Sequence, residues 1–491
     1  MRTLIRGGTV VTASDAVRAD LLIEDERVAA VLAGADAGAM EPQGDGQRPP
    51  AGPGAPGARL PGPPLPQPPA DRVIDASGRY VIPGGIDAHT HMELVNPFAV
   101  ASDDFATGTA AAAWGGTTTI IDYAGHDYGE PLPAGLERWL AKASGKAHID
   151  YGLHMMIKEV NNQVLADIGR LAEAGVTSIK LFTAYPGVYM IDDAALLRAM
   201  CRAAELGTMV AVHAENGGAI EVLTGRFMAS GQTSPRCHAR SRPAELEGEA
   251  TGRAITLARL AGAPVYIVHL TSAPALAAVH AARDDGSRVF AETCPQYLYL
   301  DESDLGREGA EGATYVCSPP LRTARDRAAL WHGLARGDLD VVATDHCPFL
   351  LADKERGLAD FTRIPGGLPG VEDRVTLVFQ GVLAGRISLN RWVEVIATAP
   401  AKLFGLYPRK GTIAPGCDAD LVIFDPSAER VISAARHHMN VDYSCYEGLR
   451  VRGLPETVLQ RGRILVADGA FHGRPGAGHY LARQPPAGAA P

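Results

Sequence analysis

The chain has 491 residues, too many for one ordinary core, so we expect one large domain and a smaller one. Its apolar fraction of 46% and charged fraction of 21% are typical of a soluble globular protein, and its net charge of −10 argues against nucleic-acid and anionic-membrane partners. Seven cysteines without a C-x-x-C spacing indicate reduced thiols in a cytoplasmic protein.

The N-terminal residues alternate between apolar and polar side chains, which predicts short strands over 1–33 and again over 71–82. The opening "MRTLIRGGTVVTASD" lacks the apolar core and cleavage site of a signal peptide. Between these segments, residues 34–70 contain eleven prolines and eight glycines with almost no large apolar side chain. Because such a stretch buries too little surface to offset its ordering entropy, it is predicted as a disordered insertion.

From 83 to 410, short apolar strands alternate with Ala- and Leu-rich helical stretches. This alternation predicts a (β/α)₈ barrel, whose size of about 250 to over 300 residues fits the segment. No apolar run reaches the roughly 18 residues of a membrane span. The eight predicted strands are 86–91, 117–122, 151–157, 177–182, 209–215, 265–271, 289–295 and 341–348.

The C-terminal residues 411–475 return to short strands, as in "DADLVIFDP" and "PETVLQRGRILVADGAF". A strand-rich start and a strand-rich end around a barrel predict one small β-sandwich domain built from both termini. Residues 476–491, which end in "RQPPAGAAP", are predicted as a tail.

Two histidines stand one residue apart at the end of the first barrel strand, in "YVIPGGIDAHTHMEL". Side chains alternate along a strand, so His89 and His91 point to the same side and could chelate one divalent metal at the barrel rim. A pair of ordinary polar residues at a strand end remains the alternative.

Four further residues of ligand type lie at equivalent strand ends: Lys180, His213, His269 and Asp345. A single buried histidine is more often a hydrogen-bonded core residue, and a lone lysine a salt-bridge partner. Six such residues at the rim of one barrel together indicate a two-metal site.

Several motifs resemble the dihydropyrimidinase/D-hydantoinase family of cyclic amidohydrolases over nearly the whole chain. They are "GGIDAHTHMEL", "IKLFTAYPGVYMIDD", "VAVHAENG", "SRPAELEGEA", "YIVHLTSA", "AETCPQYLYL", "CSPPLR", "ATDHCPF" and "GVEDR", with "APAKLFGLYPRKGTIAPGCDADLVIFDP" and "DYSCYEGLRVRGLPETVLQRGR" near the C-terminus. H-x-H occurs in many amidohydrolases, whereas its combination with "KLFTAY" and "CSPPLR" is specific.

The resemblance implies that His89, His91 and Asp345 bind one metal ion and that His213 and His269 bind the other. Lys180 would bridge both as a carbamate formed with carbon dioxide, because a protonated ammonium has no lone pair for a metal. Zinc is the expected metal, although other first-row divalent ions accept the same ligands.

The same resemblance implies a catalytic mechanism. Metal ions would activate water and polarise the ring carbonyl, and Asp345 would carry a proton to the leaving nitrogen. Tyr185 would stabilise the oxyanion, with a plain barrel-rim aromatic as its alternative.

Ser318 and Gly366 match positions that contact the substrate ring; Gly366 replaces the family's usual asparagine in I-P-N-G. The same resemblance implies that four loop residues surround the ring substituent: Met92, Leu94, Phe182 and Tyr189. Their bulk indicates an aromatic or alkyl substituent.

The expected reaction is therefore the hydrolysis of a cyclic ureide or imide, either a dihydropyrimidine or a 5-substituted hydantoin, to an N-carbamoyl amino acid. An allantoinase or dihydroorotase is the alternative enzyme, and a non-catalytic scaffold of the same fold is the alternative class. The resemblance also implies a homotetramer.

Overall fold

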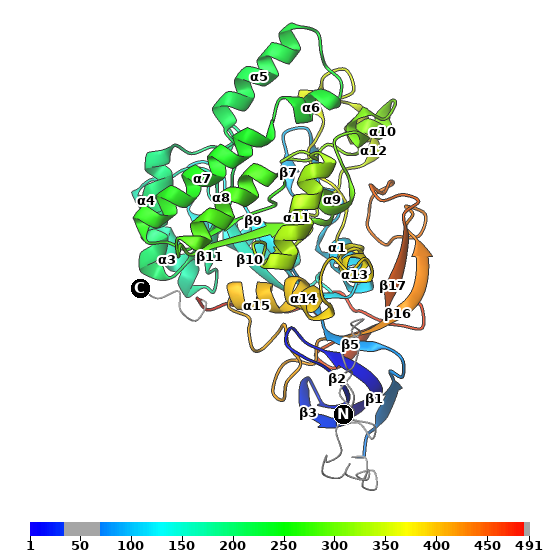
Figure 1. Ribbon diagram of the computed structural model, residues 1–491. Helices are drawn as coiled ribbons and strands as arrows, with labels where there is room; N and C mark the ends of the chain where they lie inside the picture. The colour runs from blue at the N-terminus through cyan, green and yellow to red at the C-terminus, as the bar shows by residue number, and fades with distance from the viewer. Residues whose placement is uncertain (34–68, 486–491) are drawn as a thin grey trace, which may run out of the picture.

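The computed structural model describes residues 1–33 and 69–485. Its centre is a barrel of eight parallel strands, which confirms the predicted fold class (Figure 1). Each observed strand overlaps one of the predicted ones. In spatial order they are β6 (Gly85–Thr90), β9 (Thr117–Ala124), β10 (Asp150–Met156), β11 (Ser178–Phe182), β12 (Met209–His213), β13 (Val265–Ile267), β14 (Val289–Thr293) and β15 (Val341–Val342).

Helices surround the barrel on its outside, as Figure 1 shows. The strands are apolar runs buried on both faces, whereas the helices bury one face against them and expose the other. The longer helices are α1 (Phe105–Trp114), α2 (Leu132–Ala143), α3 (Asn162–Glu173), α4 (Asp193–Leu206), α5 (Gly217–Ala229), α7 (Ala244–Ala261), α8 (Ala273–Asp284), α11 (Ala324–Arg336) and α13 (Arg374–Leu383). Shorter ones are α6 (Arg236–Arg240), α9 (Pro295–Tyr299), α10 (Ala310–Ala313), α12 (Leu351–Glu355), α14 (Leu389–Val393) and α15 (Ala399–Leu403).

The barrel closes between its first and last strands through the residues that follow β15. The amide of His91 donates to the His346 carbonyl at 2.9 Å, and Thr90 and His346 form a parallel bridge. The Thr344 hydroxyl donates to Asp87 Oδ2 at 2.6 Å. This closure brings the two ends of the barrel segment, more than 250 residues apart in sequence, to one rim.

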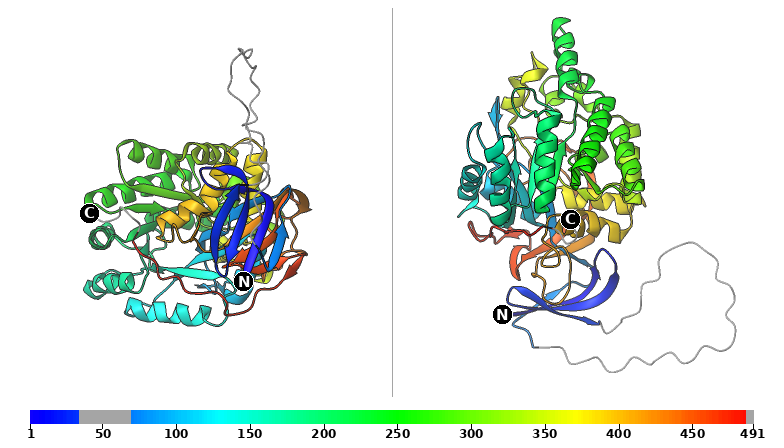
Figure 2. Two further views of the ribbon diagram at one scale, coloured as in Figure 1. Left: turned by 90° about the horizontal axis from the view of Figure 1, so that it is seen from below. Right: turned by 90° about the vertical axis from the view of Figure 1, so that its left-hand side faces the viewer.

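A second sheet is built from both ends of the chain, and Figure 2 shows their strands side by side. Its nine strands are β1 (Arg2–Val11), β2 (Ala16–Glu24), β3 (Arg27–Ala33), β4 (Arg72–Asp75), β5 (Tyr80–Pro83), β16 (Leu421–Val431), β17 (Arg450–Gln460), β18 (Arg463–Ala467) and β19 (Ala470–Phe471). The antiparallel pair β5 and β16 joins the two ends. The predicted sandwich is therefore one continuous hydrogen-bonded sheet, with its own apolar core around Leu21, Ile423 and Leu459.

The structure describes almost none of the predicted insertion 34–70, but it describes residues 476–485 of the predicted C-terminal tail. The predicted insertion 34–70 lies outside the described residues except for its last two. Within the predicted tail, residues 476–485 instead pack against the barrel: the Leu481 amide donates to the Tyr151 carbonyl at 2.7 Å, and buried Arg483 donates to Ser178 Oγ at 3.0 Å. This correction has a simple cause, since Leu481 and Arg483 find an apolar and a polar partner at the barrel strands, which local composition does not reveal.

A buried charge cluster joins the barrel to the terminal sheet. The Lys410 ammonium, 1% exposed, lies 2.8 Å from Asp150 Oδ2 at the start of β10 and 2.6 Å from Asp420 Oδ2 just before β16. It also lies 3.2 Å from Asp418 Oδ2, while Arg461 reaches Asp150 Oδ1 at 3.3 Å. These carboxylates raise the pKa of Lys410 despite its burial, so the ammonium is the form the cluster needs.

Within 1–33 and 69–485, no helix is long and apolar enough to cross a membrane. All seven cysteines are unpaired, which confirms the prediction of free thiols.

Replacing Lys410 with Met should lower the free energy of unfolding by about 3–5 kcal/mol, because it removes the cation that three buried carboxylates share and leaves Asp420 without an ion pair among the described residues. Guanidinium unfolding followed by circular dichroism measures the loss. Lys402→Met, on the exposed face of α15, is the matched control and should stay within about 0.5 kcal/mol of the wild type. Equal stability of the two variants would refute the structural role of this cluster.

Candidate metal centre

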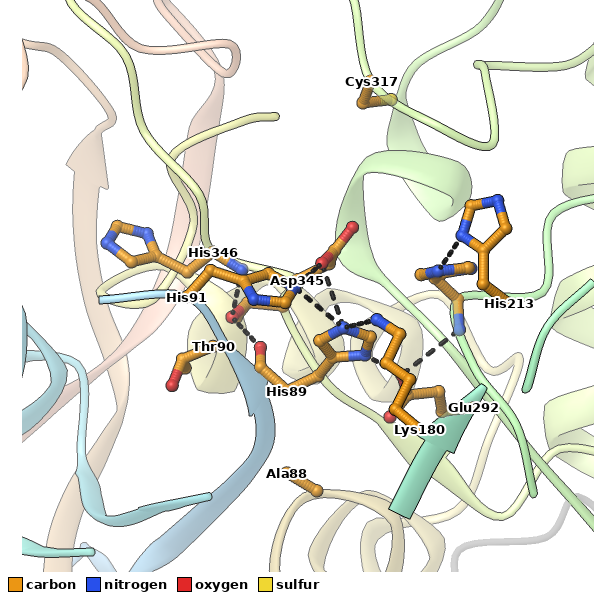
Figure 3. Close-up of polar contacts among 12 residues, drawn as sticks. Ala88, His89, Thr90, His91, Lys180, His213, Glu292, Cys317, Asp345 and His346 are labelled. Carbon is orange, nitrogen blue, oxygen red and sulfur yellow. Dashed lines mark hydrogen bonds and ion pairs between the residues drawn. The ribbon is translucent and has the colours of Figure 1, made fainter. Parts of the chain in front are cut away.

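The predicted ligands converge at the rim of the barrel formed by the carboxyl ends of its strands (Figure 3). His89 comes from β6, Lys180 from β11 and His213 from the end of β12. His91, His269 and Asp345 lie just beyond β6, β13 and β15. All six side chains are buried or nearly so.

Asp345 lies at the centre of one group of donors. Its Oδ1 is 3.1 Å from His89 Nε2 and 3.1 Å from His91 Nε2, and these two imidazole nitrogens are 3.2 Å apart. Lys180 Nζ lies 3.0 Å from His89 Nε2. The alternation argument therefore predicted correctly that His89 and His91 face the same side.

His213 and His269 form the neighbouring group, with 2.9 Å between His213 Nδ1 and His269 Nε2. The two groups are continuous, because donor atoms of His89, His269 and Asp345 all lie within 4.8 Å of one another. The six predicted residues are thus brought to one place.

Two buried glutamates orient these imidazoles from behind. An ionised carboxylate only accepts hydrogen bonds, so His89 Nδ1 donates to Glu292 Oε1 and leaves Nε2 with its lone pair toward the other ligands. Likewise, His213 Nε2 donates to Glu215 Oε2 at 2.8 Å and leaves Nδ1 toward His269. Glu292 also accepts from the Tyr266 hydroxyl at 2.8 Å and from the His269 amide at 3.2 Å.

Burial and local charge set the protonation states. Burial lowers the pKa of His91 to about 4 and that of His269 well below its ordinary value, so both rings are neutral near pH 7. Burial alone would raise the pKa of Asp345, but His89 and His91 hold it well below its usual range. Burial lowers the pKa of Lys180 to about 8.

Three residues around the centre have left-handed backbones that non-glycine residues rarely adopt. Their φ angles are 66° at Tyr185, 39° at His269 and 52° at Asp345. Such conformations persist only where the surrounding structure enforces them, and they cluster at functional sites. All three residues follow barrel strands and line the cavity described below.

The donor set fits divalent metal ions. The neutral imidazoles of His91, His213 and His269 and the ionised Asp345 carboxylate supply nitrogen and oxygen lone pairs, which first-row metals accept. The imidazole nitrogens that face each other at 2.9 and 3.2 Å are close enough for each pair to bind one cation together. Among the described residues, His91 Nδ1 and His269 Nδ1 also lack a hydrogen-bond partner.

A cavity of about 500 Å³ opens directly over these ligands. Of the predicted substrate residues, those that line it are Leu94, Phe182, Tyr185, Tyr189, Ser318 and Gly366. Met92 does not: it is fully buried in the barrel core, where it packs against Gly108 of α1. The prediction for Met92 is corrected because its side chain packs against α1 and not toward the cavity.

Several wall residues were not singled out from the sequence. Arg242 lines the cavity and pairs with Glu215 at 2.8 Å, and its guanidinium lies 5.6 Å from the centre of the Tyr185 ring. His238 Nε2 lies 2.8 Å from the Cys317 carbonyl and 3.2 Å from Ser318 Oγ. Glu215 and Glu292 had a signal, since each is an acid within or next to an apolar barrel strand; His238 had none.

The chain matches the model of the amidohydrolase family over residues 80–465. The chain belongs to the amidohydrolase family. This amidohydrolase is 53% identical over 483 residues to the D-hydantoinase of Streptomyces coelicolor, with 98% of both chains covered. It is 48% identical over 486 residues to the D-hydantoinase of Geobacillus stearothermophilus, with 98% of this chain and 97% of that one covered.

Among solved structures, the dihydropyrimidinase from Brevibacillus agri matches this amidohydrolase with a TM-score of 0.90 at 46% identity, over 99% of both chains. The resemblance to the D-hydantoinase and dihydropyrimidinase family is therefore confirmed over the full chain.

Replacing Glu292 with Gln should weaken metal binding by about tenfold or more, because the carboxylate no longer holds the Nδ1–H tautomer of His89. Dialysis against a series of buffered zinc concentrations, followed by elemental analysis, measures the affinity. Glu173→Gln, on the exposed face of α3, should bind metal as the wild type does. An unchanged metal affinity in Glu292→Gln would contradict the role of Glu292 in orienting His89.

Proposed function

We propose that this amidohydrolase opens the ring of dihydropyrimidines or 5-substituted hydantoins by hydrolysis of the cyclic amide bond, and that it yields N-carbamoyl amino acids. The observation that supports this most directly is the cavity over the candidate metal centre. Metal-ligand side chains form its floor, and Tyr185, Ser318 and Gly366 form part of its wall. The relatives named D-hydantoinase support the same reaction.

In this proposal His89, His91 and Asp345 hold one divalent metal, and His213 and His269 hold a second, most simply zinc. When bound, the metal pair would supply a water molecule of lowered pKa and a Lewis acid for the ring carbonyl. The buried, deprotonated state of Asp345 and the neutral state of His91 and His269 suit these roles.

Lys180 would act as a carbamate. Among the described residues it forms no ion pair, although it is only 2% exposed, so a permanent ammonium there lacks a counterion. The neutral amine attacks carbon dioxide, a C–N bond forms, and one proton leaves to give an anion with two donor oxygens. That anion matches a position between the two groups of ligands.

Residues of the chain would then divide the chemical work. Asp345 takes the proton of the attacking water and delivers it to the ring nitrogen as the C–N bond breaks. The Tyr185 hydroxyl donates a hydrogen bond to the oxygen on which charge develops. Its surroundings, mainly burial, raise the pKa of Tyr185, so the hydroxyl keeps its proton.

The cavity wall supports the choice of substrate. Gly366 has an ordinary backbone conformation, and a Cβ there would meet Ser318 Oγ at 3.6 Å, so the Ser318 and Gly366 segments face each other closely. They are suited to a flat ring with alternating N–H and C=O groups. Leu94, Phe182 and Tyr189 offer an apolar surface for the ring substituent.

Other cyclic amides are the second candidates. A dihydroorotate-type substrate needs a basic group for its carboxylate, and Arg242 reaches the cavity but is already paired with Glu215 at 2.8 Å. The non-catalytic scaffold is disfavoured because all six ligand-type residues are present and converge.

The proposal also includes an assembly and a compartment. The family resemblance supports a homotetramer, and the seven unpaired cysteines support a reducing compartment such as the cytoplasm. Light scattering of the purified protein would determine the number of chains in the assembly.

The purified enzyme should hold about two metals per chain and open dihydrouracil, 5-phenylhydantoin or both, measured by elemental analysis and by the loss of ring absorbance. After metal removal, zinc together with bicarbonate should restore more activity than zinc alone, because Lys180 needs carbon dioxide. Two bound metals with neither ring opened would point to another cyclic amide. No metal and no activity after reconstitution would reject the catalytic proposal.

Replacing Tyr185 with Phe should lower kcat by about 10²–10³-fold, because one oxyanion donor is lost while the aromatic ring stays. Steady-state kinetics measures this, and elemental analysis should show the metal content of the wild type. Tyr128→Phe, an exposed tyrosine whose hydroxyl bonds only the Val188 carbonyl among the described residues, is the control and should keep the wild-type kcat. A kcat within threefold of the wild type in Tyr185→Phe would remove Tyr185 from the mechanism.

A further inference from the structure

Lys354, in the short helix α12, is a fully buried cation that the proposed chemistry does not use. Its ammonium donates to three backbone carbonyls: that of Val316 at 3.0 Å, that of Pro365 at 2.7 Å and that of Gly367 at 2.8 Å. Because an ammonium has three N–H donors, all three are satisfied by main chain alone.

These carbonyls belong to the two segments that form one wall of the cavity. Pro365 and Gly367 flank Gly366, and Val316 precedes Ser318 by two residues. The Gly367 amide also donates to the Val316 carbonyl at 3.0 Å, so the segments are joined to each other as well as to Lys354. One side chain thus ties together two loops that lie about fifty residues apart in sequence.

The geometry of the peptide unit relates the hydrogen bonds of Lys354 to the cavity wall. In a trans peptide the C=O and N–H groups point in opposite directions. The Pro365 carbonyl faces the ammonium, so the N–H of Gly366 in the same peptide unit points away from Lys354. On the other segment, His238 Nε2 binds the Cys317 carbonyl at 2.8 Å and leaves little freedom to the backbone before Ser318.

The charge of Lys354 distinguishes it from a packing residue. Within 1–33 and 69–485 it forms no ion pair, and the nearest ring is Phe349, with its centre 5.8 Å from Nζ. Burial lowers the pKa of Lys354 to about 8, so the ammonium still predominates at pH 7. A buried charge without a carboxylate is costly and is retained where it binds something that an apolar side chain cannot.

We propose that Lys354 is a positioning residue for substrate binding: its ammonium holds the backbone around Gly366 and Ser318 in the arrangement that binds the ring of the cyclic substrate. This inference rests on the proposed function. Lys354 does not touch the substrate, and it acts only through the carbonyls it binds.

Replacing Lys354 with Met, which keeps the length but removes the donors and the charge, should raise KM for dihydrouracil and for 5-phenylhydantoin by about tenfold or more. The factor in kcat should be much smaller, because ring contacts made equally in the ground and transition states appear in KM. Metal content should match the wild type. Lys402→Met is the control for a lysine-to-methionine change at the surface and should keep both constants.

A second variant, Lys354→Arg, and a second measurement, hydrogen exchange, test the same role independently. Lys354→Arg keeps the charge, but a planar guanidinium cannot reproduce three donors that converge on one nitrogen, so KM should again rise. In hydrogen exchange followed by mass spectrometry, amides within 314–319 and 364–369 should exchange faster in either variant, whereas those within 86–92 should not.

The outcomes separate the two ideas. An unchanged KM in a folded Lys354 variant, or unchanged exchange in both segments, overturns the positioning role. If the wild type opens neither ring, the proposed function fails, and faster exchange in the Lys354 variants would still show that this residue holds the two segments. A fall in kcat at constant KM would also overturn the inference, because it would place Lys354 in the chemical step.

Discussion

The candidate metal centre depends on the hydrogen bonds that the carboxylate of Glu292 accepts. Glu292 lies in β14, fully buried, and accepts hydrogen bonds from the His89 ring, the His269 amide and the Tyr266 hydroxyl. One acid in the barrel wall therefore selects the tautomer of one candidate ligand and fixes the backbone of another. Glu215 likewise binds the ring of His213, and Arg242 pairs with Glu215 from the cavity side. The ligands are oriented from the barrel wall, so their free lone pairs converge without depending on flexible loops.

The closed barrel brings the ends of its short apolar strands, and the residues that follow them, to one rim. Asp345 reaches the histidines of β6 only because the chain after β15 closes against β6 through His346 and Thr344. The left-handed backbones of Tyr185, His269 and Asp345 all lie at this rim, and the local strain is supported by the surrounding closed barrel. Below the barrel, the Lys410 cluster anchors the terminal sheet, so that both ends of the chain contribute to one rigid unit.

The cavity wall is held in place by a different kind of contact. The candidate metal ligands His89 and His213 are held by carboxylates, whereas the segments that carry Ser318 and Gly366 are held by one ammonium, that of Lys354, and one imidazole, that of His238, which bind their carbonyls. This arrangement suits a site whose ring contacts are made by main chain. A glycine at position 366 is acceptable there, because its backbone conformation is one that any residue adopts and its neighbours leave room for a Cβ.

Much of the architecture was determined by the sequence alone. Alternating apolar strands and helices specify the barrel, and period-two alternation places His89 and His91 on one side, because both patterns are local consequences of backbone geometry. The positions of Lys180, His213, His269 and Asp345 at strand ends indicated the other candidate ligands, and the family resemblance assigned them to two metal ions. Tertiary structure decided the rest. It placed Met92 in the core, packed residues 476–485 against the barrel, and brought Glu292, Glu215, His238 and Lys354 behind the site. Glu292 and His238 act through partners 203 and 79 positions away, and no local pattern records which distant group a buried side chain will meet.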